Sequence, residues 1–175
     1  MKGVNAVPRE GECRETVARL MEQYGSRILR LCALRLGDAD LARDAAQETF
    51  FRAYRHYEKF RGDASELTWL SRIAVNCCRD LTRSSWHRHV NRRIDADALP
   101  EQAEAFSFPD DTVIHAVLGL NAKYREAVLL RYYQGLKLRE TAAALGLTEG
   151  AVRRRLSRAN GLLRQQLKEW YFDEE

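Results

Sequence analysis

The chain has 175 residues, a formal net charge of +4 at pH 7 and 45% hydrophobic residues. This length accommodates one ordinary domain or two small helical domains. The N-terminal stretch MKGVNAVPREGE is polar and no apolar run approaches the length of a membrane span, so the composition excludes membrane insertion and we expect a cytoplasmic protein.

Charged residues are separated into blocks of opposite sign. Residues 72–93 hold six arginines and one aspartate, residues 95–111 hold six acidic residues and no lysine or arginine, and residues 131–168 hold nine basic residues and two glutamates. A polyanion such as DNA would bind both basic blocks and repel the acidic block between them. The charge pattern therefore predicts two basic surfaces joined by an acidic linker.

Helix-forming residues dominate the sequence. All three prolines lie in the leader or in the middle of the chain, and valine and isoleucine are sparse beside alanine, leucine, arginine and glutamate. We therefore predict an all-α fold of two small helical domains joined by an acidic linker. The expected boundaries are a leader at 1–12, a first domain at 13–93, a linker at 94–111 and a second domain at 112–175.

The first predicted helix covers residues 13–36. Its buried stripe, at helical spacing, consists of Val17, Leu20, Tyr24, Ile28 and Leu31. The helix should stop at Gly37, and Asp38 or Asp40 can cap the helix that follows.

The four cysteines form no recognisable ligand or redox motif. Cys13 and Cys32 occupy apolar positions of a helical pattern, Cys77 and Cys78 are adjacent, and no histidine lies at a metal-binding spacing from them. We expect thiols packed in the core of a reduced protein, with no metal and no cofactor.

The second predicted helix, residues 40–57, has a buried face and a face with one unusual residue. The buried face contains Ala42, Ala46, Phe50, Ala53 and Tyr57. The opposite face carries Phe51 among the polar residues Asp40, Asp44, Gln47 and Glu48. A large apolar side chain ringed by polar groups is typical of a protein-binding hot spot, and plain solvation of the helix is an equal alternative. A divalent metal on the carboxylates is disfavoured because Arg43 and Arg52 flank them.

A loop at residues 60–65 precedes the third predicted helix, residues 66–84. Its inward face contains Leu70, Ile73, Ala74, Cys77 and Leu81, and its opposite face contains Arg72, Asn76, Arg79 and Arg83. Basic groups in such a row can follow a phosphate backbone, and Trp69, at the boundary, could stack on an unpaired base for about 1 to 3 kcal/mol. The alternative for Trp69 is a place in the core.

Residues 138–163 have the pattern of a helix-turn-helix. Gly146 suits a left-handed helix end and Thr148 suits the cap of the next helix. In that second helix Val152, Leu156, Ala159 and Leu163 share one face, and Arg154, Ser157 and Arg158 point away from it with Arg153 and Arg155 on the flanks. An outward face that donates hydrogen bonds and carries positive charge is what a DNA recognition helix needs, while a solvated basic face is the alternative.

Three stretches together resemble the bacterial extracytoplasmic-function (ECF) sigma factors, the smallest class of promoter-recognition subunits of RNA polymerase. The stretches are DADLARDAAQETFFRAYRHYEKFRGD, LTWLSRIAVNCCRDLTR and LLRYYQGLKLRETAAALGLTEGAVRRRLSRANGLLRQQL. They cover over half of the chain in the family's order and spacing. The chain departs from the family pattern at Arg43, Ala45, Thr141 and Asn160.

The resemblance implies two domains with different tasks. The first would dock on core polymerase and hold the non-template strand of the minus-ten element, and the second would read the minus-thirty-five duplex. Polymerase-binding residues would be Asp40, Asp44, Gln47, Glu48 and Phe51. Minus-ten residues would be Gly62, Asp63, Ala64, Ser65, Trp69, Arg72, Asn76, Arg79 and Arg83. Minus-thirty-five residues would be Thr148, Glu149, Arg153, Arg154, Ser157 and Arg158.

The same resemblance implies the partners: the clamp helices of the largest polymerase subunit, the flap of the second subunit, promoter DNA and an anti-sigma factor. It also implies that the chain is not an enzyme. Two other hypotheses are compatible with a helix-turn-helix. One is an autonomous transcriptional regulator that binds a two-fold operator without polymerase. The other is a DNA-processing enzyme such as a recombinase, for which no nucleophile beside an arginine cluster is evident.

Overall fold

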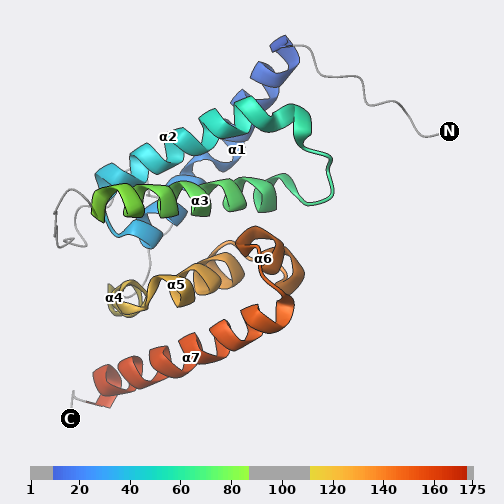
Figure 1. Cartoon of the computed structure of the whole chain (residues 1–175). Coiled ribbons are helices and arrows are strands. Elements are labelled where there is room, and N and C mark those ends of the chain that lie inside the picture. The colour runs from blue at the N-terminus through green and yellow to red at the C-terminus, as the bar shows by residue number, and fades with distance from the viewer. Residues whose placement is uncertain (1–9, 87–110, 173–175) are drawn as a thin grey trace.

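The computed structural model describes residues 10–86 and 111–172, and every regular element in these two ranges is helical, which confirms the predicted all-α fold. No helix among these residues is long and apolar enough to cross a membrane. The expected leader falls mostly, and the acidic linker except Asp111 entirely, outside the described residues. The helices form two sets, one stacked on the other (Figure 1).

The first set consists of α1 (Glu10–Leu36), α2 (Ala39–His56), the short η1 (Tyr57–Lys59) and α3 (Glu66–Trp86). The three long helices agree with the predicted ones to within three residues at each end. Asp38 caps α2 as predicted, because its carboxylate accepts hydrogen bonds from the backbone N–H groups of Asp40 (3.0 Å) and Leu41 (2.9 Å). The apolar stripes of α1, α2 and α3 face one another, and the fully buried side chains include Leu20, Ile28, Leu31 and Leu70.

The second set consists of α4 (Asp111–Gly119), α5 (Ala122–Val128), η4 (Leu129–Tyr133), α6 (Leu138–Leu145) and α7 (Glu149–Phe172). Helix α5 continues directly into η4, a π-helical turn. Trp170, Tyr171 and Phe172, which belong to the C-terminal segment WYFDEE, complete the last turn of α7.

Helices α6 and α7 form the predicted helix-turn-helix. Gly146 ends α6 with a φ of 67°, a backbone conformation that glycine adopts without steric cost. The N–H of Leu147 then donates to the carbonyl of Ala142 (2.9 Å), and the Thr148 hydroxyl accepts a hydrogen bond from the N–H of Ala151 (3.2 Å). Both predicted caps are confirmed, and they orient α7 so that Val152, which is fully buried, faces α6.

The two sets of helices share one apolar core. Buried residues of α1 and α3, such as Leu34 and Val75, belong to the same cluster as Leu130 of η4 and Val152 of α7. Helix α3 packs on α6, and α1 packs on α4, α5 and η4. The described halves of the chain therefore form one packed body, and one face of α3 lies against the second half.

All four cysteines are free thiols inside the first set of helices, as expected for core residues. Cys32 lies against Cys78, and this hydrogen-bonding contact together with burial raises the pKa of the Cys32 thiol well above its ordinary value. Burial also raises the pKa of Cys77, against a smaller opposing effect of its hydrogen bond with Thr49. Because the thiolate is the reactive form, these thiols should be inert in the folded protein.

This inertness can be measured with a thiol-specific disulfide reagent. We expect the native protein to react far more slowly than the same protein in guanidinium chloride, where all four thiols should react quickly. Rapid labelling of any cysteine in the native protein would contradict the packing described for the first three helices.

Candidate nucleic-acid interface

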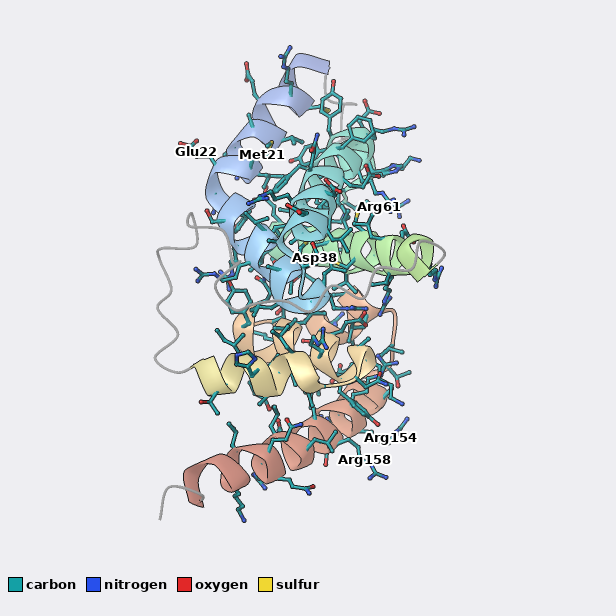
Figure 2. The ribbon with its side chains drawn as sticks, turned by 90° about the vertical axis from the view of Figure 1, so that its left-hand side faces the viewer. Met21, Glu22, Asp38, Arg61, Arg154 and Arg158 are labelled. Carbon is teal, nitrogen blue, oxygen red and sulfur yellow. The ribbon has the colours of Figure 1, made fainter. Side chains whose placement is uncertain are left out.

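The outward face of α7 is exposed and cationic. Arg153, Arg154, Ser157 and Arg158 are exposed, whereas Val152, Leu156 and Ala159 on the other face are buried. Figure 2 shows Arg154 and Arg158 extending from α7 into solvent, away from the first three helices. The helix therefore presents guanidinium donors where a DNA groove could reach them.

The polar residues on this face differ in whether their side chains are already bonded to other parts of the chain. The three arginines form none of the ion pairs that occur among the described residues, so their charges are not neutralised within this part of the chain. Thr148 and Glu149 are exposed at the N-terminal end of α7, but the Thr148 hydroxyl already caps the helix. Arg155 differs from its neighbours because it is half-buried and directs Nη1 toward the carbonyl of Lys123 (3.5 Å).

The predicted row on α3 is exposed at three of its four positions. Arg72, Asn76 and Arg83 are exposed. Arg79 is half-buried, and its guanidinium donates two hydrogen bonds to Glu126 of α5, from Nη2 to Oε2 (2.7 Å) and from Nε to Oε1 (3.2 Å). The structure thus brings three of these residues to one open surface and holds the fourth in an ion pair with the second half of the chain.

The loop between η1 and α3 is built on an aromatic cluster. The ring of Trp69 lies against Phe60 with 4.8 Å between centroids and meets the edge of Tyr57 at 6.0 Å. Trp69 is half-buried and packs against the core, so the core alternative holds for part of its side chain, and stacking of the accessible part on a base stays a prediction. The cluster brackets the loop in sequence, and within the loop Gly62, Asp63 and Ser65 are exposed and Ala64 is half-buried.

Ser65 has a structural task of its own. Its hydroxyl accepts a hydrogen bond from the backbone N–H of Thr68 (3.1 Å) and lies 2.8 Å from the Thr68 hydroxyl. It therefore caps α3, and a bound base would have to share this group with the helix. Gly62, with a φ of 74°, turns the chain back toward that cap.

The polar face of α2 also lies on the surface. Asp40, Asp44 and Gln47 are exposed, Glu48 is half-buried, and Phe51 is 54% exposed with the guanidinium of Arg55 at 5.7 Å from its ring centre. Arg43 pairs with Asp40 (2.9 Å) and Arg52 pairs with Glu48 (2.6 Å), as expected from their flanking positions. No metal-binding group of three or more His, Cys, Asp or Glu side chains occurs among the residues that the structure describes.

A groove of about 770 Å³ runs beside this face between α1 and α2. Its apolar walls include Val17, Met21, Leu29, Phe50, Phe51 and Tyr54. Met21 is 51% exposed, and it lies on the side of α1 that faces the groove, next in sequence to Glu22 on the outer side (Figure 2). The sequence did not point to Met21, although a large apolar residue just outside the buried stripe of a helix is a signal that could have found it.

Comparisons with known proteins place this geometry in a family. Residues 20–88 match the family model for Sigma-70 region 2, and residues 110–160 match the model for Sigma-70 region 4. The chain is 31% identical over 170 residues to the ECF RNA polymerase sigma factor SigW of Bacillus subtilis, and the match covers 89% of this chain and 91% of SigW. The chain belongs to the ECF sigma factors.

Solved structures have the same fold. CnrH, solved with the cytosolic domain of CnrY, is 27% identical with a TM-score of 0.66, and the match covers 89% of this chain and 90% of CnrH. The sigma factor RpoE of Bartonella quintana, solved with the anti-sigma factor NepR, is 20% identical with a TM-score of 0.69, and the match covers 86% of this chain and 96% of RpoE. As a member of this family, the chain is a promoter-specificity subunit of RNA polymerase.

The neighbouring residues Phe50 and Phe51 of this sigma factor should respond differently to truncation. Phe50 is 6% exposed and Phe51 is 54% exposed. Phe50→Ala should lower the free energy of unfolding by about 3 to 5 kcal/mol, because it leaves a cavity in the core. Phe51→Ala should change it by only about 0.5 kcal/mol. Denaturant unfolding of both variants checks this, and a large loss for Phe51→Ala would show that its side chain belongs to the core.

Proposed function

We propose that three separate surfaces of the chain perform the three contacts of a sigma factor. The polymerase surface comprises Asp40, Asp44, Gln47, Glu48 and Phe51 on α2. The minus-ten surface comprises Gly62, Asp63, Ala64, Ser65, Trp69, Arg72, Asn76, Arg79 and Arg83. The minus-thirty-five surface comprises Thr148, Glu149, Arg153, Arg154, Ser157 and Arg158. The observation that carries this proposal is that two cationic faces and one apolar-acidic face are exposed on different helices of one body.

On the minus-thirty-five surface, we assign base reading to Arg154 and Arg158. Both are exposed and extend from α7 into solvent, and an arginine binds the O6 and N7 atoms of guanine with two parallel hydrogen bonds. Arg153, on the flank of this face, and the hydroxyl of Ser157 suit contacts to phosphates.

On the minus-ten surface, the loop at residues 62–65 would receive a base that has left the stack. The aromatic cluster beneath the loop offers the exposed part of Trp69 as a stacking partner. Arg72, Asn76 and Arg83 would follow the backbone of the same strand along α3. Arg79 can join them only if it releases Glu126.

On the polymerase surface, Phe51 and the adjoining groove suit a helix of the clamp. Apolar area from Phe51 and Met21 would give affinity, and the carboxylates would select a basic partner. The flap of the second subunit would bind the second half of the chain. The work of the chain would then consist of binding alone, without catalysis, in the cytoplasm where core polymerase operates.

The free energy of strand opening explains why polymerase is needed. Separating about ten base-pair steps costs on the order of 14 kcal/mol, at a mean of about 1.4 kcal/mol per step. One stacked base recovers about 1 to 3 kcal/mol, so the minus-ten surface cannot open DNA by itself.

Permanganate footprinting of promoter DNA tests this proposal. Thymines of the minus-ten region should react when the chain is added together with core polymerase, and not when either is added alone. Phe51→Ala should weaken this reactivity in parallel with the loss of polymerase co-purification. Thymine reactivity with the isolated chain, or an unchanged complex with Phe51→Ala, would contradict the assignment.

Base reading by Arg154 predicts a sequence-dependent loss of affinity. Arg154→Ala should weaken binding to a selected upstream-element duplex by about 1 to 3 kcal/mol and should affect a random duplex much less. Arg164→Ala is the matched control, because Arg164 is exposed on the same helix beyond the minus-thirty-five surface. Equal losses on both duplexes for Arg154→Ala would reassign it to a phosphate contact.

A regulatory protein partner is also part of the proposed function. CnrH, at 27% identity, was solved in complex with the cytosolic domain of CnrY. We infer that an anti-sigma factor binds this chain as well and covers one or more of the three surfaces. Pull-down from native lysate, followed by identification of the retained proteins, should recover this partner together with the largest and the second subunits of polymerase.

A further inference from the structure

The two halves of the chain meet at a buried group of charges. Glu126 of α5 is 3% exposed and receives hydrogen bonds from two helices of the first half. Arg35 of α1, itself 6% exposed, donates through Nε (2.9 Å) with Nη2 at 2.8 Å, and Arg79 of α3 donates through Nη2 (2.7 Å). The stacking of α5 beneath α3 is visible in Figure 1.

A third guanidinium adds positive charge at this place. Arg125 donates Nη1 to the carbonyl of Arg35 (2.9 Å) and Nη2 to the carbonyls of Leu118 and Leu120. Burial and the neighbouring charge of Arg35 lower the pKa of Arg125 to about 10, so it still carries its charge at neutral pH. Two guanidinium groups are therefore bound to one carboxylate with a third nearby, and Glu126 is the acidic partner of both Arg35 and Arg79 in the ion pairs of the described residues.

A second polar contact between the halves lies on η4. Arg27 of α1 donates from Nη2 to the backbone carbonyl of Gln134 (2.7 Å), and the side-chain amide of Gln134 donates to the carbonyl of Arg27 (3.3 Å). Arg27 is exposed and lies in none of the three functional surfaces. Arg27→Ala therefore removes the bond from the Arg27 guanidinium without touching the core of either half, and leaves the bond to the backbone carbonyl of residue 27 in place.

In the closed arrangement, in which the two halves are packed together, the chain cannot bind both promoter elements at once. Two elements separated by about 25 base pairs lie on the order of 85 Å apart at about 3.4 Å per base pair. A compact chain of this length has a radius of gyration of about 16 Å. The halves must separate for the minus-ten and minus-thirty-five surfaces to engage one promoter, and separation exposes Glu126 and its partners to water.

We propose that Glu126 is an intramolecular latch that competes with the minus-ten strand for Arg79. This inference rests on the proposed function, because it takes Arg79 as a contact to that strand. In the closed chain the Glu126 carboxylate is bound to the Arg79 guanidinium, at the place where a phosphate of the DNA strand would bind. Opening releases Arg79 to the DNA backbone, and the excess of cations left at the interface makes a polyanion an effective competitor.

The test compares Glu126→Gln and Arg27→Ala in the full chain. Both should raise the radius of gyration measured by small-angle X-ray scattering. Both should also tighten binding to a short, fluorescein-labelled single-stranded DNA of random sequence. If a tenth of the molecules are open, complete opening gives about a tenfold gain in affinity.

Two features of the design separate the latch from a general effect of charge. Glu22→Gln removes the same charge from an exposed position of α1 (Figure 2) and should leave both readouts unchanged. Arg27→Ala removes a positive charge, which by itself would weaken DNA binding, so a gain in affinity can come only from opening. If Glu126→Gln fails to fold, as judged by circular dichroism, Arg79→Ala removes one of its ion pairs from the α3 side, and a rise in the radius of gyration of that variant decides whether the pair holds the halves together. Arg27→Ala then still tests whether opening raises the affinity for DNA.

The role of Arg79 is tested by a double-mutant cycle. In an Arg79→Ala background, Glu126→Gln should still expand the chain but should gain much less affinity for the strand. An equal gain in both backgrounds would overturn the competition, and unchanged compactness in Glu126→Gln and Arg27→Ala would overturn the latch. If no variant binds the strand at all, the proposed minus-ten function fails instead, while the scattering measurement still decides whether Glu126 holds the halves together.

Discussion

The arrangement of the two halves depends on how the negative charge of one buried carboxylate is neutralised by arginine side chains. Glu126 lies inside the protein and is hydrogen-bonded to Arg35 and Arg79. A buried charge without partners costs several kcal/mol, so α5 can lie against α1 and α3 only where both helices supply their guanidinium groups. The shared apolar cluster brings the halves together without directional preference, and the ion pairs determine the register in which they meet.

Features that depend on nearby residues could be predicted from the sequence. The ends of α1, α2 and α3, the cap at Asp38 and the left-handed Gly146 all follow from residues within one or two helical turns. The exposure of Arg154 and Arg158 also follows, because a helix that buries Val152 and Leu156 must direct those arginines outward. Helical periodicity alone was therefore sufficient to predict the exposed cationic face of α7.

Features that depend on contacts across the chain could not be predicted in this way. Arg79 lies on the outward side of α3, but a second half that begins after residue 110 covers it with a carboxylate 47 positions away. Arg35 pairs with the same carboxylate over 91 positions. Likewise, the groove beside Phe51 exists only because α1 places Met21 next to α2. The pattern of one helix identifies its apolar face, but it does not say what packs against its polar face.

The covered and uncovered surfaces together imply an order of binding. Asp44, Gln47 and Phe51 of the proposed polymerase surface are exposed while the halves are packed together, so this surface is accessible in the closed chain. On the proposed assignment the minus-ten strand binds Arg79, which the closed chain keeps on Glu126. A ligand that requires a form populated at about one part in ten binds about tenfold more weakly. If the proposed latch operates, closure weakens binding of the free chain to the large excess of non-promoter DNA, and polymerase, whose proposed surface does not include Arg79, binds first.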